Sequence, residues 1–142
     1  MIGIYKLDQS RYQLMLAMGY SDKALIVLDQ NLNMGTMENP SITEQHQGNC
    51  GDIMILSLKI NENMIHDARY EYIGCAGLQV CASTITELVK GKTLEQAMQI
   101  DVDDILAYLG GIPDKKYECA EISRDTLRKA INTWLNPALK VI

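Results

Sequence analysis

Three cysteines stand in turn-like stretches of this chain and could share one metal site. Cys50 lies in the sequence Gly-Asn-Cys-Gly-Asp, Cys75 in Gly-Cys-Ala-Gly, and Cys119 at the end of Lys-Lys-Tyr-Glu-Cys. Asp52 adds an oxygen ligand, and Gly51 lets the backbone bend so that Cys50 and Asp52 face the same ion. Three sulfurs and one oxygen suit tetrahedral zinc, or an iron-sulfur cluster with incomplete thiolate ligation. On spacing alone, three ordinary buried thiols are an equally good interpretation.

Two of these cysteines are predicted at the beginnings of helices. Cys75 closes a strand and opens a helix, and Cys119 ends a basic loop and opens another. The positive end of a helix dipole stabilises a thiolate, so we expect the pKa of both thiols to be lowered. Lys116, three residues before Cys119, would add to the effect. A thiolate is both a metal ligand and a sulfur nucleophile, so this placement favours metal binding and sulfur acceptance.

The remaining candidate ligands are interpreted as structural or solvent-exposed groups. Cys81 lies six residues after Cys75, about 240° around a helix and on its apolar side, which predicts a buried core thiol. His66 is placed within a strand and His46 shortly before Cys50, and neither is a favoured ligand. Glu118, beside Cys119, could compete as an oxygen ligand, but an exposed carboxylate is the preferred interpretation.

Composition favours one acidic domain. The 142 residues suffice for a single core, and the formal net charge of -5 provides no basic face, so we expect no nucleic acid partner. Four cysteines without a persuasive signal peptide indicate a reducing cytoplasm. No apolar run approaches the roughly 20 residues that span a bilayer, so no membrane partner is expected.

Hydrophobic periodicity predicts an α+β fold, with a small antiparallel sheet of about three strands covered by about five helices. Alternation predicts strands over residues 52–60 and 66–73, joined at Asn61-Glu62-Asn63, and a third strand over 41–46. His66, Ala68, Tyr70 and Tyr72 are placed on one face of the second strand.

Helices are predicted over residues 22–30, from Gly74 to Gly91, and over 93–100, 102–109 and 119–135. Ser21 is the expected N-cap of the first, with Gly35 suited to its C-terminal cap. Helical stripes are expected at Leu78, Cys81, Ile85 and Leu88, and at Leu127, Ile131 and Trp134. Residues 1–19 are interpreted as an N-terminal extension of uncertain role, in which Leu14 and Met18 could form the apolar stripe of a short helix, and residues 20–142 as one domain.

Five short stretches follow one another in order along about residues 20 to 135: Tyr20-Ser21-Asp22-Lys23; Cys50-Gly51-Asp52 followed by Met54; Asp67-Ala68-Arg69 before Gly74-Cys75; Thr86 through Ala97; and Lys116 to Cys119 before a helix containing Asp125. In these stretches the chain resembles the IscU/NifU family of iron-sulfur cluster assembly scaffolds.

The resemblance implies a scaffold, not an enzyme, although sulfurtransferase activity stays open. Such a protein accepts sulfur from a pyridoxal-dependent cysteine desulfurase, takes iron from a donor, holds a labile [2Fe-2S] cluster and passes it to apo-protein acceptors. Cys50, Asp52, Cys75 and Cys119 match the family's ligands, with Cys119 as persulfide acceptor supported by Lys116. Zinc could occupy the same site, and a homo-oligomer stays open.

The chain departs from the family pattern in two informative places. Glu118 stands where IscU-type members usually carry a histidine, so the ligand set is the cysteines with Asp52 or Glu118. Family members carry a Leu-Pro-Pro-Val-Lys segment to which a specialised heat-shock chaperone binds. In this chain its place is taken by Gly111-Ile112-Pro113-Asp114-Lys115-Lys116, so the chaperone is a doubtful partner.

Two other functions remain as alternatives. A zinc-dependent sulfurtransferase resembling SufU would accept persulfide sulfur without building a cluster. That branch carries an insertion between its second and third cysteines, for which the 44 residues from Cys75 to Cys119 leave no obvious room. A structural zinc or plain interaction module would need the cysteines only for folding. A dithiol redox role is least favoured, because the chain has no C-x-x-C pair.

Overall fold

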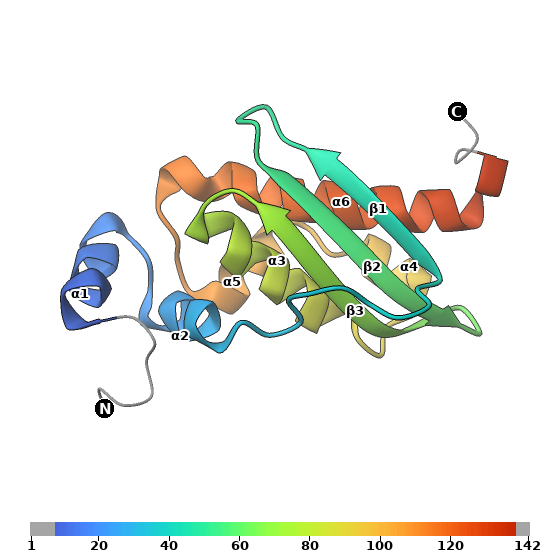
Figure 1. Ribbon diagram of the computed structural model, residues 1–142, viewed down its shortest axis with the longest axis horizontal. Helices are drawn as coiled ribbons and strands as arrows, with labels where there is room; N and C mark the ends of the chain where they lie inside the picture. Colours follow the sequence, from blue (N-terminus) through green and yellow to red (C-terminus); the bar gives the residue numbers. More distant parts are fainter. Residues whose placement is uncertain (1–7, 139–142) are drawn as a thin grey trace.

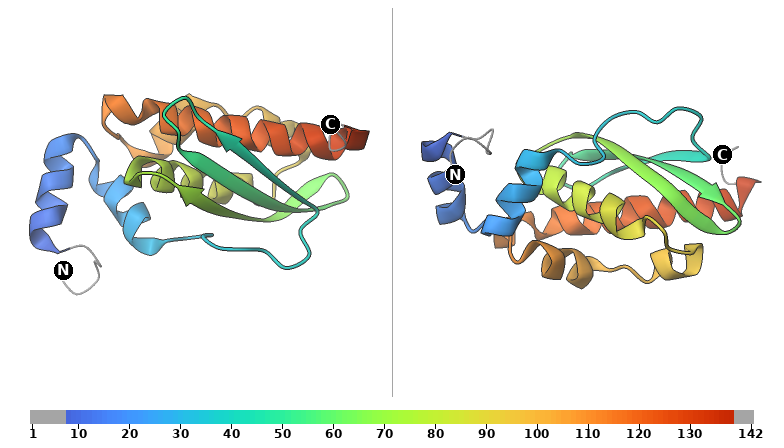
Figure 2. Two further views of the ribbon diagram at one scale, coloured as in Figure 1. Left: turned by 45° about the horizontal axis from the view of Figure 1, so that its top comes forward. Right: turned by 90° about the horizontal axis from the view of Figure 1, so that it is seen from below.

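A three-stranded antiparallel sheet packs against helices on one face (Figures 1 and 2). The computed structural model describes residues 8–138. Its strands are β1 (Ile42–Gln47), β2 (Ile53–Asn61) and β3 (Met64–Ile73), in the order β1-β2-β3. The predicted hairpin and the third strand are confirmed. Glu62 and Asn63 both have positive φ, the backbone pair that a two-residue hairpin turn requires.

A bulge shifts the register of the hairpin close to its turn. Lys59 pairs with Asp67, whereas Ile60 pairs with Ile65, so His66 is the extra residue of β3. Ile65 is buried and His66 is exposed. The prediction that His66 shares a face with Ala68 and Tyr70 was therefore wrong, because strict alternation does not hold across a bulge.

The helices confirm the five predicted segments and the short helix suggested within the N-terminal extension. They are α1 (Gln9–Met18), α2 (Asp22–Gln30), α3 (Ala76–Val89), α4 (Leu94–Met98), α5 (Val102–Leu109) and α6 (Tyr117–Leu135), with a 3-10 turn, η2 (Asp114–Lys116), before α6. Ser21 caps α2 as predicted, but the left-handed residue at the end of α2 is Asn31 and not Gly35.

The helix α1 lies within the predicted N-terminal extension. Leu14 and Met18, the predicted stripe, are 61% and 52% exposed, and Met15 is the buried residue of this helix. The stripe was therefore wrong, although the helix packs on α2. Residues 1–7 of the extension and 139–142 of the predicted domain lie outside the described residues.

The central helix α3 organises the core. It contacts β3, α2, α5 and α6, so most of its surface is buried and its buried residues extend well beyond the single predicted stripe. Met54, Leu56 and Leu58 of β2 are fully buried on the helical side of the sheet. On α6, Leu127 and Ile131 are buried as predicted, but Trp134 is 38% exposed, because the last turns of this helix extend past the core (Figure 1).

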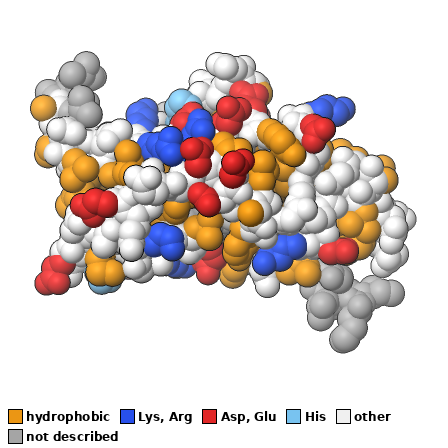
Figure 3. Space-filling model, turned by 180° about the vertical axis from the view of Figure 1, so that it is seen from behind, with side chains coloured by type: hydrophobic (Ala, Val, Ile, Leu, Met, Phe, Trp, Pro, Cys, Tyr) orange, Lys and Arg blue, Asp and Glu red, His pale blue; other side chains and the backbone are white. Residues whose placement is uncertain are grey.

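Charges of both signs lie on the helical face, which Figure 3 shows from behind. Asp101, at the start of α5, pairs with Arg124 of α6 at 2.9 Å and with Arg128 at 3.6 Å. These ion pairs connect α5 to the long helix that carries Cys119. Among the described helices, none is long and apolar enough to cross a bilayer.

Candidate metal centre

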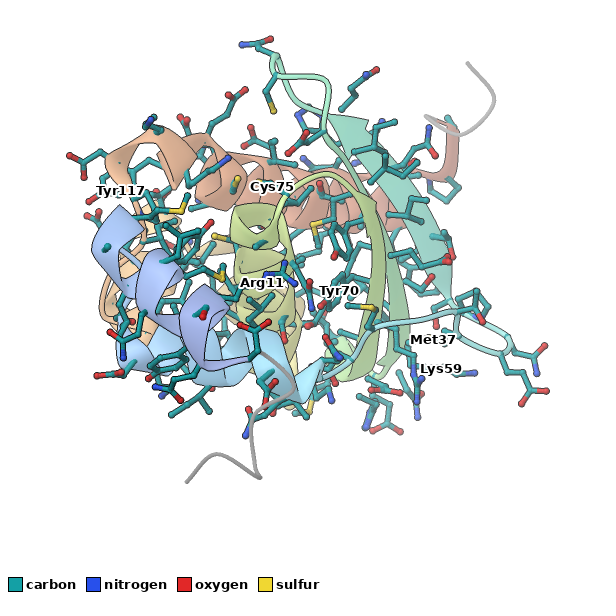
Figure 4. All side chains as sticks on the ribbon, turned by 60° about the vertical axis from the view of Figure 1, so that its left-hand side comes forward. Arg11, Met37, Lys59, Tyr70, Cys75 and Tyr117 are labelled. Carbon is teal, nitrogen blue, oxygen red and sulfur yellow. The ribbon has the colours of Figure 1, made fainter. Side chains whose placement is uncertain are left out.

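Asp52, Cys75 and Cys119 come together where three elements begin. Asp52 directly precedes β2, Cys75 is the N-cap residue between β3 and α3, and Cys119 is in the first turn of α6. One carboxylate oxygen and the two Sγ atoms all lie within 4.8 Å of one another. Figure 4 shows Cys75 at the beginning of α3, on the side of the molecule where α6 begins at Tyr117. The structure thus gathers three of the four predicted ligands.

The separation of the two thiols suits a shared ion. Cys75 Sγ and Cys119 Sγ are 3.7 Å apart. Two thiolates bound at about 2.3 Å to one tetrahedral ion lie roughly 3.8 Å apart. The two sulfur atoms therefore already have the spacing of a metal-bound pair, with the Asp52 carboxylate within reach as a third ligand.

Two glycines create the room for this arrangement. A Cβ atom at Gly74 would lie 2.6 Å from the Asp52 carboxylate oxygen. A Cβ atom at Gly77 would lie 3.2 Å from Cys119 Sγ and 3.1 Å from Lys116 Cβ. The missing side chains on both sides of Cys75 thus let the start of β2 and the start of α6 approach it. Neither glycine was predicted to have a role in the site, although their positions on either side of Cys75 in the sequence were a signal for it.

The local environment favours Cys75 as the thiolate of the pair. The pKa of Cys75 is lowered to about 5, chiefly by a hydrogen bond from the Cys119 thiol and against the opposing effect of burial. The backbone N–H of Leu78, the charge of Lys116 and the backbone N–H of Gly77 contribute the rest of the lowering. The expected lowering of the Cys75 pKa is therefore confirmed, with the helix start as a secondary cause.

The expectation for Cys119 was wrong. Its hydrogen bond to Cys75, followed by burial and the negative charge of Cys75, raises the pKa of the Cys119 thiol. Lys116 opposes this shift, as predicted, but is the smallest of these effects. Only 3% of Cys119 is exposed, a burial that its position after a basic loop did not reveal.

Cys50 lies outside this group of ligand atoms. It is exposed in the loop between β1 and β2, which Figure 1 shows projecting past the end of the sheet. Gly51 has φ +93°, so the predicted bend is present, but it does not bring Cys50 into the group with Asp52. The place of Cys50 among the ligands stays a prediction.

Glu118 contacts the loop and does not join the group. Its Oε1 accepts a hydrogen bond from the Cys50 backbone N–H at 3.3 Å. His46 is half-buried and lines a cleft with Glu118, Glu121 and Asp125 beside the same loop. Neither side chain belongs to the three-residue group, and Cys81 is fully buried in the core as predicted.

The family of this chain follows from its similarity to known proteins. The model of the NifU-like N terminal domain matches residues 19–140. The chain belongs to this family. This NifU-like domain is 35% identical over 113 residues to the iron-sulfur cluster assembly scaffold protein IscU 1 of Archaeoglobus fulgidus, covering 79% of this chain and 74% of that protein. It is 34% identical to IscU of Escherichia coli K12 over 122 residues, covering 80% of this chain and 92% of that protein.

Solved structures confirm the fold of the NifU-like domain. The N-terminal domain of a NifU-like protein from Brucella abortus superposes with a TM-score of 0.69 at 18% identity, covering 84% of this chain and 96% of that one. A protein of Fervidobacterium islandicum, described as a cluster assembly scaffold for the SUF system, gives 0.65 at 22% identity, covering 79% and 96%. The predicted α+β fold and the family resemblance are both confirmed.

Proposed function

We propose that this protein is a scaffold on which a labile [2Fe-2S] cluster is assembled and from which it is transferred. The observation that carries the proposal is the group formed by Asp52, Cys75 and Cys119, in a chain whose relatives are named as cluster assembly scaffolds. The cluster is cargo, received as iron and sulfur and delivered to apo-protein acceptors. The protein is accordingly a carrier and not an enzyme.

Each residue of the group has a proposed role. Cys75 and Cys119 hold iron through sulfur, and Cys50 completes the set when its loop folds over the group. Asp52 supplies an oxygen, which holds a soft cluster less firmly than a fourth thiolate would. The mixed ligand set therefore favours release of the cluster to an acceptor.

Cys119 is the proposed acceptor of sulfur from a cysteine desulfurase, with Lys116 beside it. Because Cys119 is only 3% exposed, the desulfurase must open the site as it docks. The turn η2 directly precedes α6, and Glu118, next to Cys119, joins the loop carrying Cys50 to α6 through its hydrogen bond, so these two segments are the ones we propose to move.

A zinc-dependent sulfurtransferase of the SufU type is the alternative. The sulfur spacing of 3.7 Å suits zinc as well as iron, so zinc binding at this site is compatible with both functions. The short connection between Cys75 and Cys119, without an added insertion, favours the scaffold.

Anaerobic reconstitution separates the two functions. The protein is incubated with ferrous iron, cysteine and a cysteine desulfurase, cluster formation is followed by visible absorption, and transfer is measured to an apo-ferredoxin. A scaffold forms a cluster that transfers to the acceptor, and Asp52→Ala, which lacks the weakly bound oxygen ligand, should transfer its cluster more slowly than the parent. Cys81→Ala is the matched control and should behave as the parent.

The opposite result has an equally clear meaning. Tight stoichiometric zinc with persulfide on one cysteine, and no cluster under any of these conditions, would assign the sulfurtransferase function. A Cys119→Ser variant that keeps its circular dichroism spectrum but loses sulfur uptake would exclude a purely structural role for the cysteines.

A further inference from the structure

The thiols of Cys75 and Cys119 are close enough to react with each other, although they are 44 positions apart in the sequence. Their Sγ atoms are 3.7 Å apart, about the van der Waals contact distance of two sulfur atoms, and both cysteines are free. Cys81 is buried in the core, and Cys50 is exposed on a loop outside the group. Within the described residues, Cys75 is thus the sulfur atom placed against Cys119.

The contact between the two thiols is built into the fold. Cys75 is the N-cap residue of α3, and Cys119, itself buried, lies in the first turn of α6. Gly77 permits this approach, because a Cβ atom there would meet Cys119 Sγ at 3.2 Å and Lys116 Cβ at 3.1 Å. A helix surface without a side chain therefore faces the sulfur that is proposed to receive the persulfide.

We propose that Cys75 releases sulfide from a persulfide on Cys119 by attacking its inner sulfur. This inference rests on the proposed function, in which Cys119 accepts sulfur. It goes beyond that function by assigning the two electrons that turn sulfane sulfur into sulfide to the cysteine pair itself.

The reaction balances without a further reagent. A bond forms between Cys75 Sγ and Cys119 Sγ, and the bond between Cys119 Sγ and the outer sulfur breaks. One of the two groups, the Cys75 thiol or the Cys119 persulfide, is ionised before the reaction. The outer sulfur therefore leaves as HS⁻, with the single proton that the other group carries. It gains two electrons, and the two cysteine sulfurs lose one each as they become a disulfide.

The position of attack follows from the geometry. The distance of 3.7 Å is measured to Cys119 Sγ, which becomes the inner sulfur of the persulfide. Attack on that atom expels sulfide, whereas attack on the outer atom would only move the persulfide to Cys75. The Asp52 carboxylate lies within 4.8 Å of both sulfur atoms, so sulfide is released beside a proposed iron ligand.

The disulfide product must be reduced before the site can bind iron through both cysteines. An external dithiol supplies these electrons by thiol–disulfide exchange. Each cluster assembled by this route therefore consumes dithiol, and without dithiol the reaction stops after one sulfide per chain.

A single-turnover experiment tests the proposal. A cysteine desulfurase is loaded with persulfide, freed of cysteine by desalting, and mixed anaerobically with the full chain in the absence of iron and thiols. Sulfide is measured colorimetrically, and the products are identified by intact and peptide mass spectrometry. We expect the parent to release sulfide and to lose the mass of two hydrogens, with a dithiol-reversible link between the peptides of Cys75 and Cys119.

The variants separate the steps. Cys75→Ser should keep a stable persulfide on Cys119, with its mass raised by one sulfur, and release at least about tenfold less sulfide. Cys75→Ala tests the same step with a residue that cannot donate a hydrogen bond. Cys81→Ala removes a buried thiol outside the pair and should release sulfide as the parent does. Circular dichroism checks that each variant is folded.

The contrary outcomes are distinct. Persulfide that stays on Cys119 in the parent, with no sulfide released, would overturn this inference and leave the proposed function intact. The same is true if Cys75→Ser releases sulfide as fast as the parent, or if Cys50→Ser alone stops release, since another thiol would then be the attacking group. If the parent releases no sulfide and neither the parent nor Cys75→Ser carries added sulfur, both the proposed sulfur acceptance and this inference are overturned.

Discussion

At the scale of single residues, the short distances between the ligands depend on two glycines, which have no side chain. Gly74 and Gly77 leave space for the Asp52 carboxylate and for the Cys119 sulfur on the two sides of Cys75. The ligand types were predictable, since Cys and Asp in turn-like stretches indicate metal chemistry. The approach of Cys119 to Cys75 was not, because it depends on how α6 packs against α3.

The substitution Gly77→Ala tests this spacing. The added methyl group would be tightly placed against Cys119 Sγ and Lys116 Cβ, so the two thiols should separate by a few tenths of an ångström. We expect zinc affinity to fall by about tenfold or more, as when other residues that support metal ligands are changed. Alanine is the better helix former, which offsets part of any cost to folding.

Competition titration with a chromophoric chelator measures this loss of affinity. Ala76→Gly is the matched control, because it changes a neighbouring residue of the same first turn without adding an atom beside Cys119. Unchanged zinc affinity in Gly77→Ala would show that the site tolerates the methyl group and that the close approach of α6 is not required.

Residue burial also limited what the sequence could predict about reactivity. The position of Cys75 at the start of a helix and the presence of Lys116 nearby could be predicted from the sequence, and the pKa of Cys75 is lowered as expected. The same reasoning was wrong for Cys119, because its hydrogen bond to Cys75, followed by its burial and the charge of Cys75, raises its pKa despite the start of α6. Two helix starts that face each other compete for one negative charge, a relation that appears only when both helices are placed.

At the scale of elements, the junction of α5 and α6 shows how the helix carrying Cys119 is positioned. Asp101 caps α5, and its carboxylate also pairs with Arg124 and Arg128 of α6. The hydrogen bond from Arg124 is the main cause of the lowered pKa of Asp101, followed by the backbone N–H of Val102. One side chain therefore connects the start of one helix to the middle of another.

This junction predicts a pH dependence of stability. Because the pKa of Asp101 is lower in the folded chain than in the unfolded one, the carboxylate stabilises the fold above its unfolded pKa of about 3.9. That contribution is lost as the pH falls through this value toward the folded pKa. Asp101→Asn keeps a good cap but removes the charge, so it should lower the urea midpoint near neutral pH and have a smaller effect near about pH 3.

Urea denaturation followed by circular dichroism measures this difference. Asp103→Asn is the matched control, because it removes a carboxylate from the same first turn of α5 and leaves the pair between Asp101 and Arg124 intact. A difference between parent and Asp101→Asn that stays constant from neutral to acid pH would rule out the ion pair as its cause.

Elements with strong periodicity were the easiest to predict. The strands, their turn and the helices α2 to α6 follow from alternation, caps and breakers in the sequence. The bulge at His66 and the exposed Trp134 were missed, because the first depends on pairing with β2 and the second on where the sheet ends beneath α6. Both are properties of neighbouring elements and not of the segment itself.

At the scale of the whole molecule, the site joins segments that are distant in the sequence. Asp52, Cys75 and Cys119 come from the start of β2, the start of α3 and the start of α6, and α6 contacts both β2 and α3. The ligand atoms are therefore within 4.8 Å only when the sheet and both helices are packed. Metal binding should consequently stabilise the whole fold and not one loop.

Zinc provides the test, because it binds the native state without redox chemistry. At free zinc about 100 times the dissociation constant, the parent should gain about 2.7 kcal/mol in its free energy of unfolding. Cys75→Ser and Cys119→Ser should lose most of this gain, since each removes one sulfur ligand of the pair. Cys81→Ala should retain the gain, whatever its own stability without zinc, because its thiol is buried outside the group. Thermal denaturation with and without zinc measures these differences, and an equal gain in Cys75→Ser would mean that the three segments do not share the ion.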